Sequence, residues 1–179
     1  MHGMDFGRLA FHDFDPSADA ALVAPSTAKA APAVPGLRVA AIDPELSDTD
    51  AFCEHYDIGP DVTGNCIIVE GRHAGVVSHA AVVVAGDARA DINGIVRRAL
   101  HVHKLSFAPM EAAVELTGME YGGITPVGLP AEWPILVDEK LAVRDEVLIG
   151  SGLRASKILL PGSSLAALPG AVSLALRRE

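Results

Sequence analysis

The sequence reads TGMEYGGITPVGL from Thr117 to Leu129, and this stretch carries most of the information about the fold. It holds four glycines, one proline and two threonines between a helix-like segment and a strand-like one. We call residues 118–128 the glycine loop. The pair Gly122-Gly123 leaves two adjacent amide groups unshielded by side chains, and such groups can bind a carbonyl, a carboxylate or a developing oxyanion. The alternative interpretation is a tight connection between two packed elements, because glycine and proline commonly mark turns.

Other segments on both sides of the glycine loop form an ordered series with it. In chain order the series is residues 87–91 (DARAD), 104–107 (KLSF), 117–118 (TG), 122–128 (GGITPVG), 135–138 (ILVD) and 150–152 (GSG). This series resembles the YbaK/prolyl-tRNA synthetase-associated domain family, a family of aminoacyl-tRNA editing deacylases. The resemblance runs from about residue 63 to residue 175, and the glycine loop is its most specific part.

Length and composition indicate one domain with a core of small side chains. The chain has 179 residues, half of them hydrophobic, and only 4% of them aromatic. A second full domain is not expected at this length. The scarcity of aromatic rings argues against a stacking platform for single-stranded nucleic acid.

The formal net charge of −9 argues against broad binding to polyanions. A tRNA partner must therefore be contacted locally, and residues 97–104 (RRALHVHK) are the best candidate for that contact. A solvated helix face and turn is the alternative interpretation of this segment.

The two cysteines, Cys53 and Cys66, offer neither a disulfide framework nor zinc-type spacing. The histidines form no HExxH pattern, so we expect no metal, and no cofactor motif is found. We see no secretory signal and no apolar run long enough to cross a bilayer. The sequence therefore predicts a reduced, soluble, cytoplasmic protein.

The order of elements predicts an α+β fold. Residues 1–36 are predicted to be an Ala/Pro-rich N-terminal extension, and residues 37–179 the editing-like domain. Strands are expected at 37–42, 65–70, 76–85, 104–107, 135–138, 146–149, 157–160 and 171–176. Helices are expected at 47–56, with Ser47 as N-cap, then after Asp91, at 109–118 and at 161–168. We expect a single domain with a mixed, largely antiparallel sheet that is curled like a barrel and flanked by helices, and the resemblance implies the same.

Asn65 is the most consequential departure from the family pattern. Family members usually carry a lysine early in the strand after the first helix, where it contacts the substrate, and Asn65 falls at that place in Thr63-Gly64-Asn65-Cys66. Asparagine donates and accepts hydrogen bonds but supplies no positive charge. Asn65 can hold the substrate carbonyl or water, another cation such as Lys104 can replace the lysine, or the site can bind without catalysis. A strand-opening hydrogen bond is the structural alternative for Asn65.

The resemblance assigns further site residues. It places Asp138 at a strand end, where a carboxylate can orient the substrate's amino group or a water, although Asp138 can also cap the segment that follows. The remaining substrate-binding candidates are Lys104 and the pocket residues Gly122, Gly123, Thr125, Gly128, Gly150 and Ser151. Ser151 is not expected to be a nucleophile, because no GxSxG elbow or assignable histidine accompanies it.

The function that the resemblance implies is that of a free-standing aminoacyl-tRNA deacylase. It would hydrolyse the ester of a mischarged tRNA in trans, contacting the aminoacyl 3′ end, and an aminoacyl-tRNA synthetase is a further candidate partner. The main alternative is a non-catalytic module that binds aminoacyl-tRNA or an aminoacyl-nucleotide, since the family lysine is replaced. A small-ester hydrolase unrelated to translation is the third hypothesis.

Overall fold

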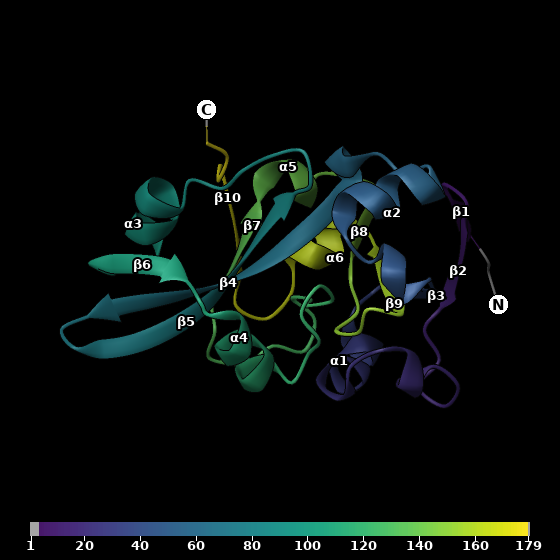
Figure 1. Cartoon of the computed structure of the whole chain (residues 1–179), viewed down its shortest axis with the longest axis horizontal. Coiled ribbons are helices and arrows are strands. Elements are labelled where there is room, and N and C mark those ends of the chain that lie inside the picture. The colour runs from purple at the N-terminus through teal and green to yellow at the C-terminus, as the bar shows by residue number, and fades with distance from the viewer. Residues whose placement is uncertain (1–3, 179) are drawn as a thin grey trace.

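Ten strands form one sheet in the computed structural model, which describes residues 4–178 (Figure 1). The strands are β1 (Met4–Phe6), β2 (Leu9–Asp13), β3 (Arg38–Ala41), β4 (Thr63–His73), β5 (Val76–Ala85), β6 (Lys104–Phe107), β7 (Ile135–Asp138), β8 (Val147–Gly150), β9 (Ser156–Leu160) and β10 (Ala171–Leu174). The helices are α1 (Pro25–Ala30), α2 (Thr49–Tyr56), α3 (Arg97–Ala99), α4 (Met110–Thr117), α5 (Glu139–Ala142) and α6 (Gly162–Ala166). Shorter helical turns are η1 (Ala20–Leu22), η2 (Ala31–Ala33), η3 (Pro44–Leu46), η4 (Pro60–Val62) and η5 (Ile92–Val96). No helix within these residues has the length and apolar character needed to cross a membrane.

The sheet confirms the predicted α+β class but not the predicted curl. Its strands follow the order β1-β2-β3-β9-β8-β4-β5-β7-β10, with β6 added beside β4. Six of the nine strand pairings in residues 4–178 are antiparallel and three are parallel, so the sheet is mixed and largely antiparallel as expected. The barrel-like expectation was wrong, because the sheet is open and ends at β1 and β10. A barrel requires every strand to be paired on both edges, and these two short strands leave an edge at each end.

Strand β4 organises the sheet because three strands pair with it. β5 runs antiparallel along almost its whole length. On the opposite edge, β8 pairs only with Thr63 and Gly64, and β6 pairs only from Val69 to Arg72. The stretch between them, residues 65–68, therefore has no strand beside it on this edge. This gap lies next to the glycine loop in the region where the sequence predicts a site.

Both faces of the sheet are buried. Successive residues of a strand point to opposite faces, and in β8 Val147 and Ile149 pack into the largest buried cluster while Leu148 packs on the other side. That second side carries two smaller clusters, one with Phe52 of α2 and one with Val96 of η5. The Val- and Ala-rich strands are therefore covered on both faces.

The N-terminal segment joins this core. β2 pairs with β3, and Phe11 is buried against α2 and β9 residues. Thr27 of α1 donates a hydrogen bond to the carbonyl of Val127, which holds α1 against the glycine loop. Residues 4–36 thus contribute to the sheet and to the core, and the division of the chain into residues 1–36 and 37–179 stays a prediction.

The helix after Asp91 and the first long helix differ in detail from the predictions. Asp91 caps its segment as predicted by accepting from the amides of Gly94 and Ile95 at 3.0 and 3.2 Å, but the segment opens as the wide turn η5. α2 begins at Thr49 with Asp48 at the N-cap position, so the predicted Ser47 cap was wrong. The reason is that Ser47 ends the preceding turn η3, where its amide donates to the carbonyl of Pro44.

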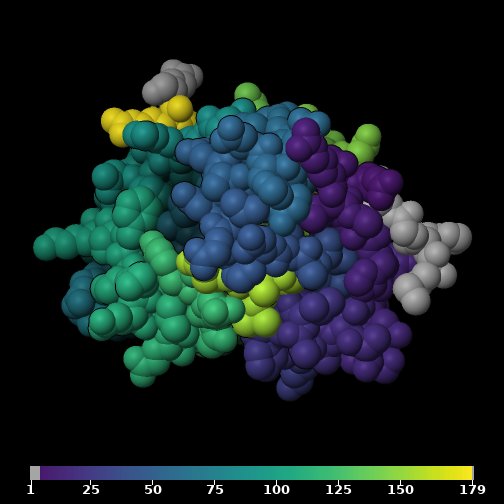
Figure 2. All heavy atoms as spheres, turned by 45° about the vertical axis from the view of Figure 1, so that its right-hand side comes forward, coloured from purple at the N-terminus to yellow at the C-terminus, as the bar shows by residue number. Residues whose placement is uncertain are grey.

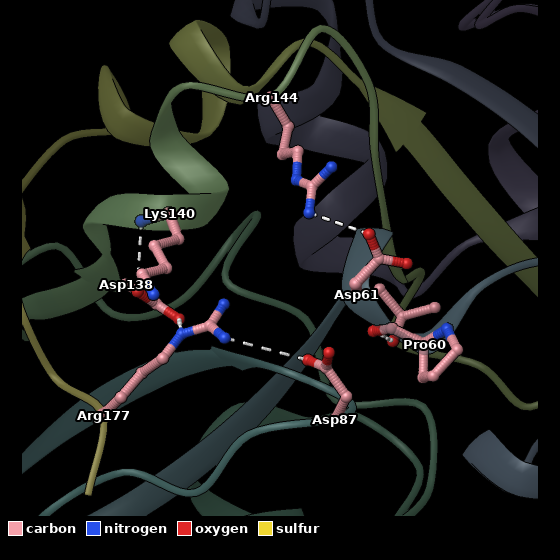
Figure 3. Close-up of polar contacts among 8 residues, drawn as sticks. Pro60, Asp61, Asp87, Asp138, Lys140, Arg144 and Arg177 are labelled. Carbon is pink, nitrogen blue, oxygen red and sulfur yellow. Dashed lines mark hydrogen bonds and ion pairs between the residues drawn. The ribbon is translucent and has the colours of Figure 1, made fainter. Parts of the chain in front are cut away.

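A buried carboxylate fastens the end of the chain to the sheet (Figure 3). Asp138 is fully buried at the end of β7, accepts from Nε of Arg177 at 2.8 Å and caps α5 by accepting from the amide of Lys140 at 3.1 Å. Arg177 also lies 4.0 Å from a carboxylate oxygen of Asp87. Because β10 runs parallel to β7, Arg177 can reach back to the strand end. Asp138 thus joins β7, α5 and the segment after β10.

We predict that Asp138→Ala destabilises the protein. The change leaves the partly buried Arg177 without its nearest carboxylate and removes the cap of α5, which should lower the free energy of unfolding by about 2–4 kcal/mol. Urea denaturation measures this value. Asp145→Ala is the matched control, because Asp145 is exposed, and it should change the value by less than about 0.5 kcal/mol. Equal stability of the two variants would contradict the fastening role.

Candidate functional site

A cavity of about 290 Å³ lies at the gap in the edge of β4. Its walls come from residues 47–49 before and in α2, residues 64–68 of β4, the segment from Phe107 to Ala113, the glycine loop, and Gly150 and Lys157 of β8 and β9. Figure 2 shows this face, where the blue segment with α2, the green segment with α4 and the glycine loop, and a yellow-green strip from the β8–β9 region meet. Three parts of the chain, within residues 47–68, 107–124 and 150–157, thus surround one hollow.

The backbone of β4 offers hydrogen-bonding groups to this cavity. The amide of Ala108 donates to the carbonyl of Ile68 at 2.9 Å, so Ile68 directs its backbone groups to the edge with the gap. Alternate residues of a strand face the same edge, and Cys66 therefore directs its N–H and C=O there as well. No strand lies opposite Cys66 on this edge. A ligand in the cavity can pair with these groups.

Asn65 is held in one orientation by α2. The hydroxyl of Thr49 donates to Oδ1 of Asn65 at 3.0 Å, and both residues line the cavity. This contact occupies the carbonyl end of the amide and leaves the Nδ2 hydrogens for a ligand. Asn65 is therefore a hydrogen-bond donor with a fixed orientation near the start of β4.

Glycine is required where the glycine loop crosses β8. A Cβ on Gly150 would lie 2.6 Å from the carbonyl oxygen of Gly123, closer than real contacts allow. Gly122 has a φ of +88° and, like Gly150, lines the cavity. The amide of Gly123 donates within the loop to the carbonyl of Glu120 at 3.0 Å, so only one of the two predicted amide donors is left for a ligand.

Four predicted pocket residues lie behind the wall of the cavity and do not line it. They are Gly123, Thr125, Gly128 and Ser151. Thr125 is fully buried beneath the loop. A Cβ on Gly128 would lie 2.6 Å from the backbone of α1, and a Cβ on Gly123 would lie 2.7 Å from the carbonyl of Leu153. The buried hydroxyl of Ser151 donates to the carbonyl of Leu153 at 3.0 Å. These residues shape the wall from outside.

Asp138 and Lys104 lie outside the cavity. Asp138 is occupied by the contacts with Arg177 and α5 described above. Lys104 is exposed and lines a separate hollow of about 500 Å³ together with Arg72, Arg97 and His103. The structure thus brings Asn65, Gly122 and Gly150 together and leaves the other predicted residues apart.

A third hollow lies between the hollow at Lys104 and the cavity. This middle hollow, of about 730 Å³, shares Asn65, Ile67 and Phe107 with the cavity and shares Asn93, Leu105 and Ser106 with the hollow at Lys104. Two arginines, Arg89 and Arg178, also line it. A row of hollows with basic side chains in their walls therefore runs along β6 from the gap in β4 to Lys104 at the start of β6.

Lys157 is a cavity residue that the sequence pattern did not single out. It lies on β9, and its Nζ is 3.4 Å from the carbonyl of Ser47 and 5.2 Å from the ring centre of Phe52. Burial is the main cause that lowers the pKa of this lysine from its ordinary value. The signal that could have found it is its place opposite Gly150 in the β8–β9 hairpin, which requires the strand register.

The thiol of Cys66 is not an activated nucleophile. Burial raises its pKa to about 12, so the thiol stays protonated near neutral pH. Within the described part of the chain, no three His, Cys, Asp or Glu side chains gather in a way that would hold a metal ion. The cavity therefore offers hydrogen-bond donors and one cation.

Comparisons with known proteins bear on this arrangement. Among the curated proteins none matches the chain. A solved structure described as a proposed trans-editing enzyme for prolyl-tRNA synthetase superposes with a TM-score of 0.70 at 24% identity, covering 80% of this chain and 87% of that chain. The structure of a hypothetical protein superposes with a TM-score of 0.70 at 26% identity, covering 79% of this chain and 91% of that chain. These likenesses show a shared fold.

The family model of the aminoacyl-tRNA editing domain matches residues 43–168, which is well over half of the 179 residues. The matched range includes α2, β4, the glycine loop, β8 and β9, and so contains every segment that surrounds the cavity. The fold, the glycine loop and the family model agree, and the chain belongs to the aminoacyl-tRNA editing domain family.

Proposed function

We propose that the protein is a free-standing deacylase that hydrolyses the ester of a mischarged aminoacyl-tRNA. The observation that carries the proposal is the cavity at the gap of β4, where Asn65 presents an oriented amide beside a strand edge that no other strand of residues 4–178 covers. Membership of the editing-domain family supports an aminoacyl-tRNA substrate. The adjoining hollows with basic side chains support the same conclusion, because they offer a place for the 3′ end of the nucleic acid.

The reaction needs positioning more than it needs a nucleophilic side chain. Water forms a bond to the ester carbonyl carbon, the bond from that carbon to the ribose oxygen breaks, and a proton from the water ends on the ribose oxygen. The free amino acid leaves as a carboxylate and releases a second proton. Negative charge develops on the carbonyl oxygen during the attack, and donors fixed in advance lower the barrier. Nδ2 of Asn65 is such a donor in this proposal.

The nucleic acid is placed along β6. The amino acid occupies the cavity of about 290 Å³, and the terminal nucleotides follow the path past Phe107 toward Arg97 and Lys104. The chain carries a net charge of −9, so this basic strip is a local exception that can contact phosphates. The segment 97–104 that the sequence suggested for this contact lies partly on this path.

A binding module is the second candidate. It is favoured by one observation, which is that Asn65 carries no charge where family members usually have a lysine. In that case the same cavity would hold an aminoacyl-tRNA or an aminoacyl-nucleotide without turnover.

We predict that Asn65→Ala removes most of the deacylase activity. Loss of a fixed donor to the developing oxyanion should lower kcat by about 100-fold while the protein stays folded. The measurement is release of labelled amino acid from a panel of correctly and wrongly charged tRNAs. Lys29→Met is the control, because Lys29 is exposed on α1 away from the three hollows.

Three results would separate the candidates. Selective release from one mischarged tRNA, reduced by Asn65→Ala, establishes editing and identifies the substrate. Binding of the charged tRNA with no release above the spontaneous rate would leave the binding module. Equal cleavage of a simple aminoacyl ester and a charged tRNA would indicate an ester hydrolase unrelated to translation.

We also predict that Thr49 acts as a positioning residue through Asn65. Thr49→Val removes the hydrogen bond to Oδ1 and should lower kcat by about tenfold with little change in KM, because the amide can turn away from the carbonyl. Thr49→Ser keeps the hydroxyl and should retain kcat within about twofold. Steady-state kinetics on the preferred tRNA measure both. Equal loss in the two variants would indicate that Thr49 acts by packing alone.

A further inference from the structure

We propose that Lys157 is a catalytic residue, whose ammonium group stabilises the negative charge that develops on the substrate's carbonyl oxygen. The inference deepens the proposed function and rests on it. It places the positive charge of the site on β9, one strand away from β8 and two strands away from Asn65 on β4. The substrate chemistry that this residue recognises is an acyl group whose carbonyl oxygen becomes an oxyanion.

The first support is position. Lys157 and Asn65 line the same cavity, and both also line a small adjoining space of about 20 Å³ with Thr49. Lys157 pairs with Gly150 across the β8–β9 hairpin. Paired residues of neighbouring strands project from the same face, and on that face the backbone of the glycine loop crosses Gly150, where a Cβ would lie 2.6 Å from the carbonyl oxygen of Gly123. The lysine therefore lies at the wall of the cavity, beside the place where the glycine loop crosses β8.

The second support is the charge environment. Within residues 4–178 no carboxylate lies within ion-pair distance of Nζ, and its contacts are the carbonyl of Ser47 at 3.4 Å and the ring of Phe52 at 5.2 Å. A half-buried ammonium without a counter-charge costs folding free energy. Such a group is best explained by a ligand that brings the missing negative charge, and perturbed ionisable groups of this kind cluster at functional sites.

The ionisable groups around Lys157 come from several elements. Cys53 of α2 and Asp48 before α2 raise its pKa, and Arg154 before β9 lowers it, but burial is the largest effect and the pKa is lowered overall. Tyr121 of the glycine loop lines the same cavity. Since Asp48 is exposed and makes no ion pair with Lys157, the charge on the lysine remains available to a substrate.

The third support is the position of the other candidate cation. Lys104, which the sequence offered as a replacement for the family lysine, lines the distant hollow and not the cavity. Lys157 is the lysine that shares the cavity with Asn65. The two residues divide the work in this proposal: Asn65 donates a neutral hydrogen bond, and Lys157 supplies the charge. The lysine keeps its proton throughout and forms no covalent bond.

The decisive experiment compares Lys157→Met, Lys157→Arg and the control Lys29→Met in deacylation of the preferred charged tRNA. Lys157→Met should lower kcat by about 100-fold or more, because a charged oxyanion donor is lost. It should leave the melting temperature unchanged or higher, because a desolvated charge is replaced by an apolar chain of similar length. Lys29→Met should match the wild type.

The pH profile distinguishes a charge role from a packing role. The lowered pKa of Lys157 means that the wild type should lose activity as the pH rises through that value, since the neutral amine no longer stabilises the oxyanion. Arginine stays protonated over this range, so Lys157→Arg should retain part of the rate and lack this alkaline decline. An identical alkaline decline in the Lys157→Arg variant would overturn the proposal.

A binding measurement separates failure of this inference from failure of the proposed function. The probes are a phosphonate analogue of an aminoacyl-adenosine, which carries the oxyanion, and the corresponding neutral amide. Lys157→Met should weaken phosphonate binding by at least about tenfold and amide binding by less than about threefold. If this selective loss is seen but the wild type shows no turnover, the deacylase function is refuted and Lys157 remains the oxyanion-binding residue. Full turnover or unchanged phosphonate affinity in Lys157→Met would sink the inference alone.

Discussion

The missing strand partner along residues 65–68 of β4 is the constraint on which the rest of the site depends. Backbone N–H and C=O groups need hydrogen-bond partners when they are buried, and the edge at Cys66 receives none from a strand. The pairing of β8 with β4 ends at Gly64, and the pairing of β6 with β4 covers only Val69 to Arg72, so neither strand reaches Cys66. The start of α2 and the glycine loop lie beside this edge and form walls of the cavity. A fold that completed the sheet here would have no room for a substrate.

The local patterns in the sequence were sufficient for the elements and for part of the site. Runs rich in Val and Ile predicted β4 and β5, Asp91 predicted a cap, and the glycine loop predicted a close backbone approach, which Gly150 and Gly123 make. Asn65 was singled out because it falls where members of the resembled family usually carry a lysine. These features depend on residues close to one another in the chain, so they can be predicted without knowing how the strands pair.

The remaining features depend on long-range register, which no local pattern contains. The prediction of a barrel-like sheet was wrong because the strands at the two edges decide whether a sheet closes. Here the short strands β1 and β10 lie at the edges and leave the sheet open. Asp138 looked like a site residue at a strand end, but the parallel pairing of β10 brings Arg177 to it. Lys157 was overlooked for the same reason, since only the pairing with Gly150 places it at the cavity.

The contact between α1 and the glycine loop has an evolutionary consequence. α1 lies outside the range that the family model matches, yet Thr27 holds the carbonyl of Val127 and the amide of Ala24 donates to the carbonyl of Ser151. Both contacts support the wall of the cavity from behind. Drift in this N-terminal segment can therefore alter the shape of the cavity while every residue that lines the cavity stays the same. The set of ligands that fit the cavity can change in this way without any change in the lining residues.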